Sequence, residues 1–329
     1  MALSTDPVTI SGAEHKLRYM TLDVRRLRLL REVALRGTIA AAAEALAFTP
    51  SAISQQLSAL ERESGATLLE RQGRRVRLTD AGRLLVEHAE TILIELERAQ
   101  AALEASQSTV SGTVRLASFS SVAITLVTPA VVALRDAYPD LCVTMSKLEP
   151  EDSLRELQLA DLDLVLAYEY SHTAEALGAG LERTELFAEA MSVVVPPGWV
   201  EPGVALELDD LKAEVWAAAP ADTGCGRAFR TACRSAGFTP DVRYTSADFN
   251  VILHLIEAGA AVSVLPELAF GVVDCDYQVH ALAGPPLERR VFAAVRAGSR
   301  NRPSLRAALD ALTQAAADRP QVLKVPVGG

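Results

Sequence analysis

A short segment beginning at Pro50 carries side chains that suit contact with nucleic acid. If it is a helix, Ile53, Leu57 and Leu60 fall on one side. The opposite side holds hydroxyls, an amide and a guanidinium, and it has no carboxylate. Such groups can hydrogen-bond to base edges and phosphates without repelling the DNA backbone. This polar set comprises Ser51, Ser54, Gln55, Ser58 and Arg62.

A basic segment follows at residues 71–79, with the sequence RQGRRVRLT. Val76 and Leu78 alternate with cationic residues after Gly73, which is typical of a two-stranded wing with cations on its solvent face. Cations there would contact phosphates that flank a groove, so they would contribute affinity rather than sequence preference. These cations are Arg71, Arg74, Arg75 and Arg77.

The preceding sequence supplies helices that can hold these segments in place. A helical pattern spans 23–36 and ends at Gly37, and Thr38 can cap a second helix over 39–46 that is almost all alanine. Thr49 can cap the third helix, which has proline in its first turn. Two short helices joined by a tight turn form a helix-turn-helix. The sequence therefore predicts a DNA-reading module.

Charge is distributed unevenly along the 329-residue chain, whose net charge is −10. Residues 21–83 contain 11 Lys and Arg against 7 Asp and Glu, whereas residues 84–329 contain 19 against 33. A small basic module is thus joined to a large acidic body, which indicates a nucleic-acid-binding end on a body with another role.

Composition excludes several other classes of protein. We find no run of 18 apolar residues for a transmembrane helix and no secretory signal, so we expect a cytoplasmic protein. The cysteines are too few and too scattered for a disulfide framework or structural zinc, and we expect no metal and no cofactor. They are Cys142, Cys225, Cys233 and Cys275.

A long helix is predicted from Thr79-Asp80 to about Ser106, with apolar residues spaced 4, 3, 4, 3 and 4 apart. This heptad pattern requires a partner helix, and the same helix of a second chain is the simplest one. A dimer would present two recognition helices to two half-sites. The predicted dimerisation residues are Leu85, Ala89, Ile92, Leu96, Ala99 and Leu103.

Three motifs in order give the chain a family resemblance. The run GTIAAAAEALAFTPSAISQQLSALE at 37–61, GATLLER at 65–71 and RLTDAG at 77–82 resemble the LysR-type transcriptional regulators. The resemblance covers nearly the whole chain after residue 20. Thr38-Ile39 and Gln55 depart from residues frequent in the family, which leaves the operator sequence open. The family's DNA-reading positions correspond to Thr49, Ser51, Ser54, Gln55, Gln56 and Ser58.

This resemblance implies a fold that is α/β overall. It consists of an all-α winged helix-turn-helix N-terminal domain, a long linker helix and a two-lobed α/β periplasmic-binding-protein-like effector domain. We assign residues 21–79, 80–110 and 112–319 to these parts, with tails at 1–20 and 320–329. The first lobe would take about 112–186 and 298–319 and the second about 187–297, with crossings near Thr184–Ala188 and Gly298–Pro303.

The alternation of strands and helices after Gly112 supports that effector domain. In such sheets, ligands bind beyond the carboxyl ends of strands, so polar residues there are candidates for contact with a small-molecule effector of unknown identity. A hydroxyl-rich helix start could suit a carboxylate or another anion. The predicted effector-binding residues are Ser118, Phe119, Ser120, Ser121, Tyr168, Thr223, Ser246 and Asp248.

Other interpretations remain open at the sequence level. The chain could be an enzyme or a solute-binding protein, although its five histidines are isolated and no nucleophile or nucleotide-binding motif is present. Alternatively, a regulator could respond to oxidation of Cys225 and Cys233, since Cys225 is predicted at a helix start. The resemblance further implies that the protein binds promoter DNA and RNA polymerase and forms a tetramer from two dimers. We expect no association with a membrane.

Overall fold

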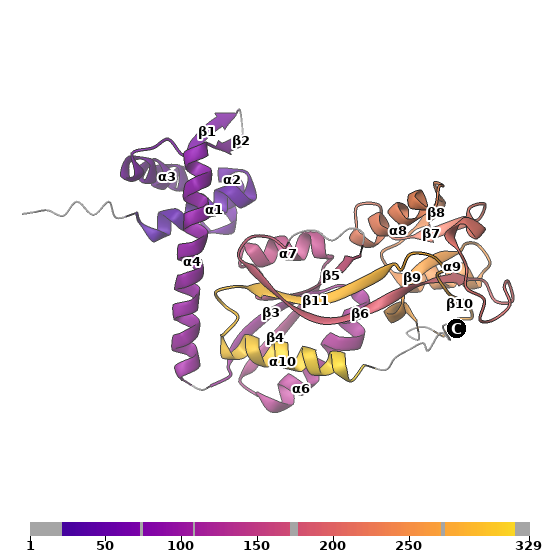
Figure 1. The fold of residues 1–329 in the computed structure, drawn as a ribbon. Coiled ribbons are helices and arrows are strands. Elements are labelled where there is room, and N and C mark those ends of the chain that lie inside the picture. Colours follow the sequence, from indigo (N-terminus) through magenta and orange to yellow (C-terminus); the bar gives the residue numbers. More distant parts are fainter. Residues whose placement is uncertain (1–21, 73–74, 108, 172–176, 271–273, 320–329) are drawn as a thin grey trace, which may run out of the picture. The chain divides into compact units, whose positions relative to one another are not determined.

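The computed structural model describes residues 22–72, 75–107, 109–171, 177–270 and 274–319. Both predicted tails, 1–20 and 320–329, lie outside these ranges. The chain divides into two compact units, Met1–Ile92 and Leu93–Gly329 (Figure 1), and each is described by itself.

The first unit is built from three helices and a two-stranded hairpin. Helices α1 (Val24–Arg36), α2 (Ile39–Ala45) and α3 (Pro50–Ser64) have N-caps whose side chains accept a backbone N–H, namely Asp23, Thr38 and Thr49. Strands β1 (Leu69–Gln72) and β2 (Arg75–Leu78) pair in antiparallel fashion. The predicted helix-turn-helix and its wing are therefore both present.

The core of the first unit joins these elements to the start of α4 (Asp80–Ser106). Ile53, Leu57 and Leu60 of α3 are fully or almost fully buried, as its periodicity predicts. The buried Glu32 carboxylate accepts hydrogen bonds from Arg31 and Arg36, and Arg31 also pairs with Glu90 at 2.7 Å. Ion pairs thus supplement apolar packing between α1 and α4.

The first lobe of the second unit is a sheet covered on both faces. Its strand order is β6-β11-β5-β3-β4, with β3 (Gly112–Ser118), β4 (Leu141–Lys147) and β5 (Leu164–Tyr170) parallel. Strands β6 (Leu181–Val195) and β11 (Glu288–Arg296) are antiparallel to each other. The segment α5 (Ser120–Val122), η1 (Ala123–Val127) and α6 (Thr128–Ala137) shares one apolar core with α10 (Pro303–Ala317). Helix α7 (Pro150–Gln158) supplies Leu157 to a second core.

The helical segment Ser120–Ala137 is apolar and long enough to cross a membrane by length and composition alone. Val122, Leu126, Val127 and Leu134 are nevertheless buried against the sheet of the first lobe. These contacts identify the segment as a core helix rather than a membrane span.

The second lobe contains β9 (Ser263–Pro266) and β10 (Gln278–Ala281), which pair with β6 (Leu181–Val195). It also contains the parallel pair β7 (Val215–Ala218) and β8 (Asp241–Thr245). Helices α8 (Gly224–Ser235) and α9 (Phe249–Glu257) pack in separate apolar clusters around these strands. Short helices η2 (Leu208–Leu211) and η3 (Glu267–Ala269) complete it.

The two crossings between lobes differ from the predicted positions. Strand β6 pairs with β11 (Glu288–Arg296) up to Ala190 and with β9 from Met191 onward, so the first crossing lies beyond Thr184–Ala188. Strand β11 pairs with β5 from Arg289 to Val295. It belongs to the first lobe, so the prediction of a second crossing at Gly298–Pro303 is wrong, because the chain has already returned before β11.

Candidate DNA-binding face and ligand cleft

The outer face of α3 presents polar groups to solvent. Ser51, Gln55, Ser58 and Arg62 are exposed, and Ser54 is half-buried, with its hydroxyl donating to the Pro50 carbonyl at 2.9 Å. The hydroxyl of Thr49 is 3.2 Å from the amide nitrogen of Ala52, whose N–H it accepts as the N-cap of α3. Most of the predicted reading face is therefore free to contact DNA.

The carboxylates of α3 are committed to contacts within the first unit. Glu61 accepts hydrogen bonds from the backbone N–H groups of Leu68 and Leu69, at 2.8 and 3.3 Å. Glu63 pairs with Arg26, which also donates to the Gln56 side chain at 2.9 Å. These contacts leave the outer face of α3 without a competing anion. The hydrogen bond from Arg26 also holds the Gln56 side chain against α1.

The hairpin that follows α3 in the sequence carries several basic residues. Leu69 lies opposite Leu78, and Glu70 lies opposite the exposed Arg77. Arg71 is in β1 and Arg75 is in β2, while Arg74 lies outside the described residues. Glu70 adds an exposed acidic residue to the wing.

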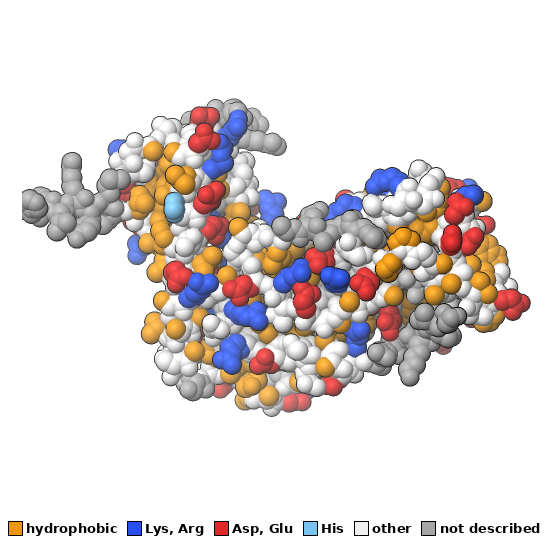
Figure 2. Space-filling model, viewed as in Figure 1, with side chains coloured by type: hydrophobic (Ala, Val, Ile, Leu, Met, Phe, Trp, Pro, Cys, Tyr) orange, Lys and Arg blue, Asp and Glu red, His pale blue; other side chains and the backbone are white. Residues whose placement is uncertain are grey.

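Helix α4 buries part of its predicted seam and exposes the rest. Ala89 is fully buried in the core of the first unit and Leu85 packs against that core, so the prediction that Ala89 contacts a second chain is wrong. Leu96 and Leu103 are 48% and 63% exposed, and Ile92 and Ala99 are also exposed. Leu84, which was not predicted, is exposed as well. Hydrophobic side chains accordingly appear at the surface along α4 (Figure 2).

Three of the loops expected to bind an effector do meet in a cleft between the lobes. The enclosed volume is about 20 Å³, which is room for one water-sized group. The Ser120 hydroxyl lines this cleft, and it is buried without a hydrogen-bond partner. The predicted residues that line the cleft are Phe119, Ser120, Ser121, Tyr168 and Thr223, and the residues that sequence reasoning missed are Glu149, Ala219, Cys225, Ala247, Phe249 and Arg289.

Arg289 is the central charged group of the cleft. It is 1% exposed and donates to Glu189 at 2.7 Å and to the Ser121 hydroxyl at 3.3 Å. Its guanidinium also lies over the rings of Phe119 and Tyr168. Glu189 and Arg289 are directly paired in the register of β6 and β11, next to the crossing between lobes. This ion pair therefore connects the cleft wall to the crossing strands.

A second acidic residue shares the cleft. The Tyr168 hydroxyl donates to Glu149 at 3.1 Å. Burial raises the pKa of Glu149, and the neighbouring Glu151 adds to the increase, while the Tyr168 hydrogen bond opposes it. Burial likewise raises the pKa of Tyr168 far above its ordinary value, so Tyr168 stays a neutral donor. The cleft wall thus offers both donors and acceptors to a ligand.

Three predicted effector contacts are local structural residues instead. The buried Ser118 hydroxyl donates to the Phe119 carbonyl at 3.2 Å. Ser246 accepts the N–H of Asp248, and Asp248 caps α9 by accepting the N–H of Asn250. None of the three lines the cleft, so their prediction as effector contacts is not supported by the geometry.

Burial disfavours reactive thiolates at the two cysteines considered for redox sensing. It raises the pKa of Cys225, against the opposing effect of the nearby Arg289 charge, and it raises the pKa of Cys233 to about 12. Because the thiolate is the reactive form, both side chains suit packing better than oxidation.

Two family models match the chain. Residues 24–83 match "Bacterial regulatory helix-turn-helix protein, lysR family", and residues 107–317 match "LysR substrate binding domain". The transcriptional dual regulator GltC of Bacillus subtilis is 26% identical over 250 residues, which cover 76% of this chain and 82% of GltC. The HTH-type transcriptional regulator MetR of Salmonella typhimurium is 27% identical over 281 residues, covering 84% and 85%.

Solved structures share the fold across almost the entire chain. A full-length OxyR from Pseudomonas aeruginosa has a TM-score of 0.64 at 20% identity, covering 92% of this chain and 98% of OxyR. Full-length CbnR, solved in complex with its target DNA, has a TM-score of 0.51 at 22% identity, covering 89% and 99%. These similarities extend the match from the individual domains to their order along the chain.

Proposed function

Because the chain belongs to the LysR family of bacterial DNA-binding transcriptional regulators, we propose that it binds promoter DNA as a homo-oligomer under the control of a small molecule in the inter-lobe cleft. The observation that carries the DNA-binding part is the exposed, carboxylate-free face of α3. GltC and MetR are transcriptional regulators, and we infer that this chain is also a regulator rather than an enzyme. We also propose that it acts in the cytoplasm.

Replacing Arg77 by alanine tests the proposed phosphate contacts. We expect Arg77→Ala to weaken binding to every duplex alike and to lower the slope of log affinity against log salt by about one. The measurement is a gel-shift titration of full-length protein at several salt concentrations, with a specific operator selected from random duplexes and an unrelated duplex. An unchanged salt slope would contradict a phosphate contact at Arg77.

The exposed apolar residues of α4 support the proposed dimer. Leu96→Ala removes apolar area from both chains of a symmetric pair, so we expect the dimer to dissociate about tenfold more readily. Sedimentation over a concentration series measures this. Glu95→Ala, on the same helix but outside the apolar stripe, is the control. Equal dissociation of both variants would place the dimer contact elsewhere.

The narrow cleft supports control by opening of the lobes. Across the lobes, Arg227 of α8 pairs with Glu151 of α7 at 3.0 Å, and the neighbouring cleft at Ser120 and Arg289 has room for only a water-sized group. A larger effector would bind a more open state and shift the population toward it. A thermal-shift screen of the full chain against metabolites would find such a ligand, because a ligand bound only by folded protein raises the melting temperature.

We further propose that two dimers assemble into a tetramer and that the DNA-bound protein contacts RNA polymerase.

A further inference from the structure

The second half of α4 contacts the first lobe along one face of the helix. Glu97 and Glu104 lie two helical turns apart, so both project from that face. Glu97 accepts a hydrogen bond from Arg296 at 3.0 Å, and Glu104 accepts one from Arg302 at 2.8 Å. Ala101, between them on the same face, is fully buried. This part of α4 is therefore packed as an element of the second unit.

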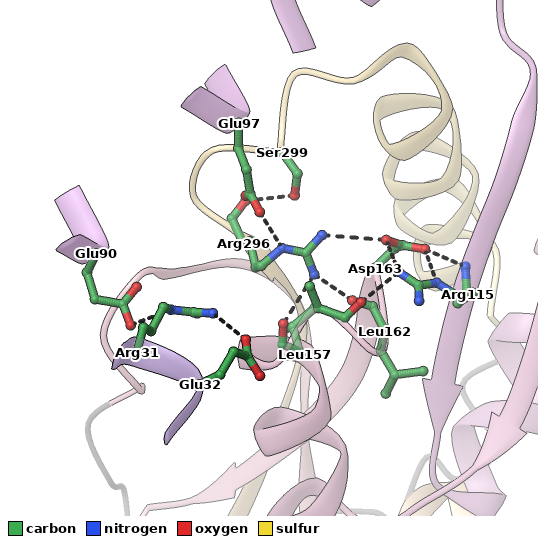
Figure 3. A network of polar contacts seen from close by, with 11 residues as sticks. Arg31, Glu32, Glu90, Glu97, Arg115, Leu157, Leu162, Asp163, Arg296 and Ser299 are labelled. Carbon is green, nitrogen blue, oxygen red and sulfur yellow. Dashed lines mark hydrogen bonds and ion pairs between the residues drawn. The ribbon is translucent and has the colours of Figure 1, made fainter. Parts of the chain in front are cut away.

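Arg296 is the centre of this attachment (Figure 3). Its guanidinium is almost fully buried, donates to the carbonyls of Leu157 and Leu162 at 3.2 and 2.6 Å, and lies 3.5 Å from Asp163. Burial would raise the pKa of Asp163, but hydrogen bonds from Arg115 outweigh it, and the carboxyl pKa is lowered. Asp163 is thus an anion that, with the carbonyls, holds Arg296 in one orientation toward α4.

Gly298 shows how closely the backbone approaches the helix. A Cβ at this position would lie 2.4 Å from the Glu97 Cβ and 2.6 Å from the Ile94 carbonyl oxygen. Both atoms belong to the helix frame, so neither can rotate away. Any larger side chain at residue 298 would therefore force the backbone at this position and α4 apart.

Strand β11 connects this attachment to the cleft. Arg289 lies in the cleft wall and Arg296 lies at α4, seven residues along one strand, or about 23 Å. Residues 291–295 between them are buried in the two cores of the first lobe. A buried strand paired on both sides transmits displacement of one end to the other, because packed cores deform little.

We propose that Arg296 is a positioning residue that fixes the second half of α4 on the first lobe, so that β11 carries changes at the cleft to the direction of the linker helix. This inference rests on the proposed function for its effect on DNA, whereas the attachment itself can be tested without DNA.

The first experiment measures the distance between α4 and the first lobe in full-length protein. Spin labels are placed on the exposed native Cys142 and on Arg98→Cys, with Cys275→Ser to remove the remaining accessible thiol. Labelled protein is diluted with unlabelled protein so that only distances within one chain are seen. We expect Glu97→Ala and Gly298→Ala to broaden and shift the distance distribution relative to the parent.

The matched controls are Glu95→Ala, at an exposed site on the same helix, and Gly178→Ala, where an added Cβ meets only the flexible amide end of Gln158. Both should leave the distribution unchanged. If Glu97→Ala and Gly298→Ala also leave it unchanged, Arg296 does not position α4 and the proposal is overturned.

The second experiment compares a selected full operator with a single half-site. Loss of positioning should weaken full-operator binding by Glu97→Ala about tenfold, because two linked modules lose effective concentration, and should leave half-site binding unchanged. Equal loss on both duplexes would indicate general damage and would reject the positioning role. If the parent protein binds no DNA, the proposed function fails, while the spin-label distances still decide whether Arg296 holds α4.

Discussion

Introducing a carboxylate into the reading face of α3 is expected to lower operator affinity by about a hundredfold or more, because like charges brought together at an interface cost several kcal/mol. The substitution is Gln55→Glu, which changes one amide to a carboxylate of the same size at an exposed position. The neighbouring carboxylates of α3 are turned into the unit by Leu68, Leu69 and Arg26. The new anion would face the phosphates without a compensating partner.

The measurement is a fluorescence-anisotropy titration with a selected operator, alongside circular dichroism to verify that α3 still folds. Gln107→Glu adds the same charge at an exposed residue beyond the end of α4 and controls for the change in net charge. Gln55→Ala should weaken binding less, since it removes a contact without adding repulsion. Binding by Gln55→Glu comparable to that of Gln107→Glu would show that α3 does not enter the groove.

Local physics made the first unit predictable from the sequence. Caps at Thr38 and Thr49, the left-handed conformation of Gly37 and the 3.6-residue period of α3 act within a few residues of each other. These signals predict both limits of α1 and α2 and the start of α3 to within one residue. The burial of Ala89 within its own chain was not predictable in this way. A heptad pattern is the same whether a second chain or the chain's own core covers the apolar residues.

The cleft was harder to predict because its key contacts link distant parts of the chain. Arg289 and Glu189 are 100 residues apart, and each occurs in a segment whose charges alone suggest solvent exposure. Ser246 and Asp248 lie after the carboxyl end of a strand, where ligand-binding residues often occur. Their side chains are instead used in short-range hydrogen bonds at the start of α9. The part of β6 at Leu181–Ala190 carries charged residues on a partly exposed surface, so its sequence lacks the apolar pattern of a buried strand.

The buried pair itself yields the second large expected effect. Glu189→Gln should destabilise the second unit by about 3–5 kcal/mol, because it leaves the Arg289 charge buried without its partner. In a unit of this size that corresponds to roughly 10 °C in melting temperature. Glutamine retains an oxygen that can accept the N–H of Leu268, as Glu189 does at 2.8 Å, while its NH2 group replaces the oxygen that accepts from Arg289, so the change removes the charge together with that hydrogen bond.

Calorimetry of the full chain, resolving the transition of the second unit, measures this loss. The double variant Glu189→Gln/Arg289→Met should be more stable than Glu189→Gln alone, because removing the second charge also removes the cost of burying it unpaired. Additive losses in the double variant would mean that the two side chains act independently. In that case Arg289 would be held by Ser121 and the rings of Phe119 and Tyr168, and the crossing strands would carry no charge-dependent link to the cleft.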